Sequence, residues 1–138
     1  MKEIINPQLN AEYVISDPGF HDANLTKVEL LPEETVSLLF VTLSSAVYEI
    51  ILHGVKHLNC TSFKEGNTVF EIIAWSSKEY PLEELRNLLN LQVGKSVTYL
   101  NDVAKKIEKG NLTLFIVNPS YGCELVCLCG SYKIIRIS

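Results

Sequence analysis

The pair His21-Asp22, in the segment GFHDAN, carries the residue types best suited to chemistry. A His-Asp dipeptide ligates metal in the helical phosphohydrolases, but those sites need further His and Asp residues on several helices, which this sequence does not supply. Adjacent loop residues also capture anions or simply bond to the local backbone. We expect a structural role first, and a contact with a partner or ligand second.

A second candidate is the segment LHGVKHL, where His53 and His57 lie four residues apart around Gly54. On a helix this spacing would place both imidazoles on one face, but across a strand end and a turn it does not make them converge. No HExxH motif supplies the general base of a zinc hydrolase. His53 and His57 are therefore candidates for binding only.

Catalytic motifs are absent from the rest of the sequence, which contains no GxSxG elbow, P-loop or GxGxxG. Glu49 and Glu71 each interrupt an apolar strand and could act as acid and base if both pointed inward. The wet face of a one-sided sheet is the more frequent place for such residues. The sequence indicates no catalytic residue, metal site or cofactor.

Four cysteines and two aromatic residues complete the candidates. Cys60 stands alone, and the others lie in CELVCLC without paired CxxC motifs, so we expect packed thiols, with redox or metal work as the alternative. Trp75, at a predicted strand end, is either a partner anchor or a residue of the core edge. Tyr121 lies in the predicted turn 118–122 and is a binding candidate.

These residues must be positioned by a strand-rich frame. Residues 1–24 contain Pro7 and Asp17-Pro18-Gly19 and indicate an extended arm with turns. Residues 25–76 show a period of two, with short connections that favour an antiparallel meander. One strand, TVSLLFVTL, is apolar on both faces and is predicted to be central or covered on both sides.

The period then changes to that of a helical pair over 81–109. Pro81 suits a first helical turn, Ser96 is the expected N-cap of the second helix, and Gly110 is the expected stop. The residues expected to face the core are Leu82, Leu85, Leu88 and Leu89, then Leu100, Val103, Ala104 and Ile107.

Residues 111–137 return to strands, and Cys123, Leu125, Cys127 and Cys129 are predicted to share one face. The sequence therefore predicts a single α+β domain over 1–138. We expect a mainly antiparallel twisted sheet or half-barrel of about seven or eight strands, with two consecutive helices inserted before the last three strands. A homodimer is one way to cover its apolar edge strands.

Composition narrows the choice of partners. The net charge is −4, with nine acids and four bases in 1–69 against seven acids and eight bases in 70–138. This balance argues against nucleic-acid binding, and an acidic N-terminal half could steer a basic protein. No stretch approaches the ~20 apolar residues of a membrane span, and no signal-peptide pattern opens the sequence, so we expect a cytoplasmic protein.

Four short segments together resemble the immunity proteins of bacterial polymorphic toxin systems. They are Phe20-His21-Asp22 before the first long strand, Gly54-Val55, Gly66-Asn67 leading into a strand, and Ser120 with Gly122 before a Cys-containing strand. The resemblance implies a protein that occludes a toxin without catalysis, and it carries over no contact residues.

Three functions remain open from the sequence. The leading expectation is a non-catalytic protein-binding module of the immunity type. The second is a β-rich domain that binds a small ligand in the mouth of a curved sheet. The third is a small enzyme that uses His21, Asp22 and a carboxylate.

Overall fold

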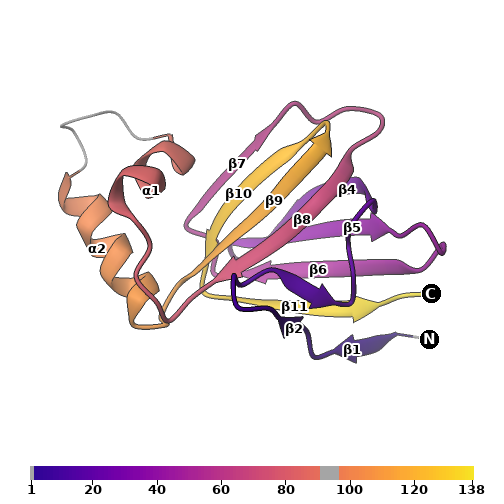
Figure 1. The fold of residues 1–138 in the computed structure, drawn as a ribbon, viewed down its shortest axis with the longest axis horizontal. Coiled ribbons are helices and arrows are strands. Elements are labelled where there is room, and N and C mark those ends of the chain that lie inside the picture. The colour runs from indigo at the N-terminus through magenta and orange to yellow at the C-terminus, as the bar shows by residue number, and fades with distance from the viewer. Residues whose placement is uncertain (1, 91–96) are drawn as a thin grey trace.

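A computed structural model describes residues 2–90 and 97–138, and shows an α+β fold of the predicted kind. Two helices lie between β8 and β9, before the last three strands, as the sequence predicts (Figure 1). The described elements are β1 (Glu3–Ile5), β2 (Gln8–Leu9), β3 (Ile15–Asp17), β4 (Asn24–Leu31), β5 (Thr35–Val41), β6 (Val47–His53), β7 (His57–Thr61), β8 (Thr68–Trp75), α1 (Leu82–Leu88), α2 (Val97–Glu108), β9 (Thr113–Tyr121), β10 (Glu124–Cys129) and β11 (Ser131–Arg136).

Nine of these strands form one antiparallel sheet in the order β1-β11-β6-β5-β4-β8-β9-β10-β7. β4 and β8 pair only through Asn24 and Thr68, whereas their other neighbours pair along most of each strand. The sheet therefore folds at this junction into two layers (Figure 1). We call them the β5 half (β1, β11, β6, β5 and β4) and the β9 half (β8, β9, β10 and β7). Because β1 and β7 end the order without pairing to each other, the sheet is not a closed barrel.

The larger core lies between the two halves. Alternate residues of β5 and β6, such as Phe40 and Ile50, face alternate residues of β8 and β9, such as Ile72 and Phe115. Phe20, from the N-terminal arm, packs against Phe40 and Tyr48 at ring distances of 5.2 and 5.5 Å. This packing excludes water from the inner face of the sheet, and the buried apolar area stabilises the fold.

The helical pair covers the outer face of the β9 half and forms a second core. The residues from both sides are Leu85, Leu89, Leu100, Val103 and Ile107 of the helical region, with Leu114, Ile116, Val126 and Leu128 of the strands. Leu88 and Ala104 pack against this core while only partly buried. The prediction for Leu82 was wrong, because its side chain is 44% exposed. Ser96, the predicted N-cap, lies outside the described residues.

The outer face of the β5 half differs from that of the β9 half, because neither described helix packs on it and its apolar side chains belong to neither core. Leu39, Val41, Ile51 and Ile135 are half-buried there. The expectation for TVSLLFVTL, a central strand or one covered on both faces, is confirmed in its first form, because β5 lies inside the sheet between β6 and β4. The possible homodimer stays a prediction.

The N-terminal arm holds more pairing than the sequence indicated. β1 pairs with β11, with Ile4 opposite Ile135, and β2 pairs with β3 in a separate two-stranded sheet. A bridge between Val14 and Ile73 attaches the arm to β8. The arm is thus tied to both halves of the folded sheet.

Candidate functional site

Three distant segments meet where β4 and β8 begin and β9 ends. The backbone of the arm runs beside β8: the N–H of Asp22 donates to the carbonyl of Val69, and the N–H of Val69 donates to the carbonyl of Ala23, both at 2.8 Å. The N–H of Leu25 donates to the carbonyl of Asn67 at 2.9 Å. These bonds fix residues 20–25 against the start of β8.

Asn67 is the buried centre of this meeting point, with 1% of its surface exposed. Its Oδ1 accepts from the N–H groups of Lys64 (2.8 Å) and Cys123 (3.0 Å). Its Nδ2 donates to the carbonyls of Leu25 (3.1 Å) and Lys64 (2.8 Å). One side chain therefore joins the start of β4, the 62–67 loop and the turn before β10, and it has all its hydrogen-bonding atoms satisfied.

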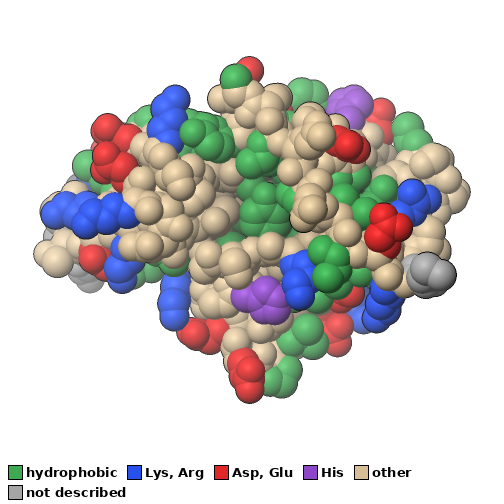
Figure 2. Space-filling view, turned by 90° about the horizontal axis from the view of Figure 1, so that it is seen from below, with side chains coloured by type: hydrophobic (Ala, Val, Ile, Leu, Met, Phe, Trp, Pro, Cys, Tyr) green, Lys and Arg blue, Asp and Glu red, His purple; other side chains and the backbone are tan. Residues whose placement is uncertain are grey.

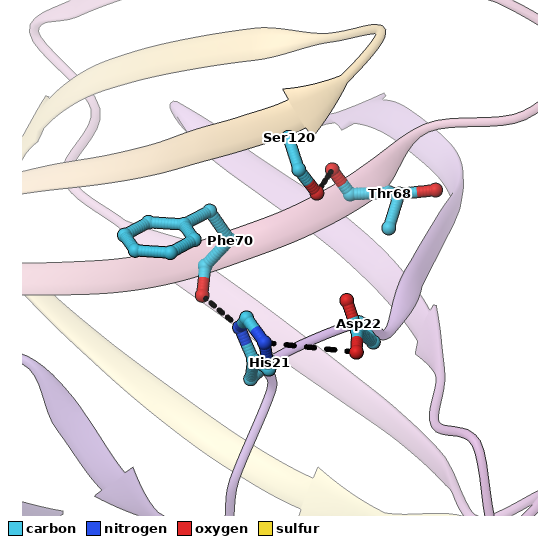
Figure 3. A network of polar contacts seen from close by, with 5 residues as sticks. All are labelled: His21, Asp22, Thr68, Phe70 and Ser120. Carbon is cyan, nitrogen blue, oxygen red and sulfur yellow. Dashed lines mark hydrogen bonds and ion pairs between the residues drawn. The ribbon is translucent and has the colours of Figure 1, made fainter.

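His21 and Asp22, the binding candidates from the sequence, lie on the surface beside β8. The Nδ1 of His21 lies 3.0 Å from the carbonyl of Phe70, and its Nε2 lies 3.6 Å from Oδ2 of Asp22 (Figure 3). Since a carbonyl only accepts, Nδ1 must carry a proton in this contact. The imidazole also meets the Phe70 ring edge-on at 5.5 Å. Both polar side chains are well exposed to solvent.

Tyr121 lies on the same end of the sheet, opposite Thr68 in the β8–β9 register. Ser120 Oγ donates to the carbonyl of Thr68 at 3.4 Å (Figure 3), and Nζ of Lys64 sits 5.0 Å from the centre of the Tyr121 ring. Phe70 is 51% exposed and Tyr121 is 58% exposed. We call this surface, made by His21, Asp22, Lys64, Phe70, Ser120 and Tyr121, the aromatic end.

Phe70 is the aromatic residue of this surface that sequence reasoning missed, and Lys64 was not a candidate either. Strict alternation places Phe70 inside with Ile72 and Ala74, and Val69 outside. In the structure Val69 is buried and Phe70 is exposed, because the β8–β9 register shifts between Val69 and Glu71. A β-bulge reverses the phase of a strand at this point, and the sequence gives no local signal for it.

The remaining histidines do not join the aromatic end. His53 is exposed at the far end of β6, six residues along from Val47, which is roughly 20 Å of strand. Its carbonyl accepts from the N–H of Gly130, where the chain crosses between the two halves. His57 lies on β7, and its Nε2 is buried without a hydrogen-bond partner among the described residues. The three histidines therefore do not converge.

Trp75 belongs to the core edge beside the helices. Its ring lies 4.4 Å from that of Tyr13 and 5.2 Å from that of Tyr80, and its Nε1 donates to the carbonyl of Lys78 at 2.9 Å. These contacts occupy the ring faces and the indole N–H. Of the two readings from the sequence, the core-edge role fits this geometry.

The two strand carboxylates lie in different halves and have separate partners. Glu49 accepts a hydrogen bond from Ser37 Oγ at 2.5 Å, and Glu71 accepts one from Asn118 Nδ2 at 3.1 Å. Surface hollows of 170 to 370 Å³ occur on the described residues, and none of these hollows is lined by His21, Asp22 or either glutamate. Within the described part of the chain, Glu49 and Glu71 therefore do not form an acid–base pair around one of these hollows.

The three cysteines of CELVCLC follow the prediction of packed thiols, but Cys60 on β7 does not. Cys123, Cys127 and Cys129 face the inner core with Leu125, whereas Cys60 is exposed. Burial and a hydrogen bond with Cys60 raise the pKa of Cys123 from 9.0 to about 12. A hydrogen bond with Cys129, together with burial, raises the pKa of Cys127. The thiols of Cys123 and Cys127 therefore keep their protons near neutral pH.

Among residues 2–90 and 97–138, no group of three or more His, Cys, Asp or Glu side chains could hold a metal ion. Neither described helix is long and apolar enough to cross a membrane. Comparison with known proteins gives no matching family model, no matching curated protein and no matching solved structure.

Proposed function

We propose that this chain is a non-catalytic protein-binding module that holds its partner against the aromatic end. One observation carries the proposal: Phe70 and Tyr121 are more than half exposed on a surface whose backbone is fixed by the buried side chain of Asn67. Aromatic side chains are enriched at the centres of protein interfaces, because they bury large areas at small cost in conformational entropy.

The polar residues around the rings suit a protein partner. His21 and Asp22 offer exposed hydrogen-bonding groups at the rim, and Lys64 offers a positive charge beside Tyr121. Such a mixed rim around aromatic residues gives specificity through hydrogen bonds. The resemblance to immunity proteins supports a toxin as the partner, occluded by this surface.

Charge steering by an acidic half is a weaker part of this proposal. Glu29 and Glu34 each lie 3.2 Å from a lysine, Lys27 and Lys56 respectively. On the face drawn in Figure 2, acidic and basic side chains are interspersed. We therefore place the main contribution to affinity in the aromatic side chains.

The test uses proteins encoded beside this chain as candidate partners. Once one binds, the double variant F70S/Y121S should weaken the equilibrium dissociation constant by at least ~30-fold, since two hot-spot side chains contribute about 2 kcal/mol or more. L30S is the matched control: Leu30 is 73% exposed at the other end of β4. Titration calorimetry measures all three proteins. Equal affinity of F70S/Y121S and the wild type would rule out this surface.

A small-ligand function has one observation in its favour. A hollow of about 370 Å³ lies at the far end of β4, lined by Leu30, Leu31, Glu34, Thr35, Val36, Val55 and Leu58. Its size and apolar lining suit a small hydrophobic molecule. Native mass spectrometry of the purified chain would show a retained ligand, and L58W, which fills the hollow, should abolish retention.

A further inference from the structure

Cys60 and Cys123 form a thiol pair whose side chains are not part of the aromatic end, although the backbone N–H of Cys123 donates to Asn67. Cys60 lies on the edge strand β7, and Cys123 immediately precedes its neighbour β10. Their Sγ atoms are 3.0 Å apart, which is about 1 Å longer than a disulfide bond. Cys60 lies opposite Leu125 in the β7–β10 register, so these two side chains point to the same side of the sheet. Cys123 lies two residues before Leu125, and its side chain points to that side as well.

The two thiols differ in their access to solvent. Cys60 is exposed, whereas Cys123 is 2% exposed and Cys127 and Cys129 are fully buried. A small oxidant therefore reaches Cys60 first. Cys123 precedes the first residue of β10, so it is outside the strand ladder and a small rotation of its side chain closes the remaining distance.

We propose that Cys60 and Cys123 close to an intramolecular disulfide when a hydroperoxide oxidises Cys60. The Cys60 sulfur attacks hydrogen peroxide, an S–O bond forms, the O–O bond breaks and one water leaves. The Cys123 sulfur then attacks the Cys60 sulfenic acid. The S–S bond forms, the S–O bond breaks, and the hydroxyl group leaves as a second water with the Cys123 proton. Two thiols together lose two electrons, which reduce the peroxide.

The bond would tie an edge strand to the body of the sheet. It would link residues 63 positions apart in the chain and hold β7, which pairs only with β10, against that strand. Edge strands open at lower free energy than central ones, and a cross-link over a long loop restricts the unfolded chain. The oxidised protein should therefore melt at a temperature higher by about 10 °C. This inference is independent of the proposed binding function.

The experiment treats the full-length, reduced chain with hydrogen peroxide and records its intact mass under denaturing conditions. The wild type should lose about 2 Da and keep two of its four thiols for maleimide labelling, namely Cys127 and Cys129. C60S should show no such loss. C123A should instead accumulate a sulfenic acid on Cys60, trapped by dimedone.

Circular dichroism confirms that each variant is folded, and C60S is the safer variant because its side chain is exposed. Four labelled thiols in the treated wild type would overturn the proposal. So would a mapped disulfide that includes Cys127 or Cys129, the same mass loss in C60S, or an exclusively intermolecular cross-link through Cys60.

Discussion

At the scale of single residues, Asn67 and Gly122 hold the backbone that supports the exposed side chains of the aromatic end. Gly122 has a φ of +89°, where a side chain is strained. A Cβ at this position would lie 2.6 Å from Oδ1 of Asn67 and 2.8 Å from the carbonyl of Gly66. The missing side chain lets the turn before β10 approach the buried amide.

We expect G122A to destabilise the fold by about 2–4 kcal/mol, because it combines backbone strain with a clash against backbone atoms. G66A is the matched control in the same region: Gly66 does not have a positive φ, and no atom lies within 4 Å of its added Cβ. Urea unfolding followed by tryptophan fluorescence measures both. Equal stabilities of G122A and G66A would contradict this account.

At the scale of elements, the helical pair works as a cover that contributes one apolar stripe to the second core. Leu85 and Leu89 are buried against the β9 half, while Leu82, one turn earlier, faces outward. The acidic side chains of Glu83 and Glu84 lie in the first turn of α1, where the helix dipole favours them. Because Leu82 is exposed, the buried stripe of this helix is narrower than the spacing of its leucines indicated.

The contrast between two leucines of α1 gives a direct test. L85A should cost about 2–5 kcal/mol of unfolding free energy, because it leaves a cavity under a fully buried side chain. L82A should cost less than about 1 kcal/mol, because Leu82 is 44% exposed. Thermal and urea unfolding report both values. If L82A cost as much as L85A, the second core would extend to a face that the structure leaves open.

At the scale of the whole molecule, one folded sheet encloses the main core between its two halves. Tyr132, near the start of β11, lies beside Phe115 of the other half with ring centres 5.6 Å apart. Burial, with a contribution from Cys129, raises the pKa of Tyr132 above its usual 10.0. Burial, with a contribution from the charge of Glu84, also raises the pKa of Tyr80. The core thus contains groups that resist ionisation.

These shifts predict a loss of stability at alkaline pH. The folded state holds the protons of Tyr132 and Cys123 more tightly than the unfolded state, so their contribution is full at neutral pH. It is lost as the pH rises from about 9, the usual pKa of a thiol, towards about 12. The unfolding free energy should fall over that range, and Y132F should show a shallower fall.

Y99F, at an exposed position, is the control and should follow the wild type. Urea unfolding at successive pH values gives the slope for each protein. A slope that is unchanged in Y132F would show that Tyr132 ionises equally well in the folded and unfolded states.

Local patterns in the sequence were sufficient to place the helical pair, the strand-rich blocks and the inward face of Cys123, Cys127 and Cys129. Periodicity and end signals such as Gly110 act between residues close in the chain, so the sequence displays them directly. The residue types of His21 and Asp22 also suggest binding from the sequence alone, and that role stays a prediction.

Tertiary structure alone decided how those pieces combine. The bulge that turns Phe70 outward, the contact of Phe70 with His21, and the meeting of Cys60 with Cys123 each depend on how segments far apart in the chain are aligned. A register is set by the packing of both layers at once, and a shift of one residue reverses which side chains are exposed. For this reason the surface that we propose for binding is a property of the folded sheet and of no single segment.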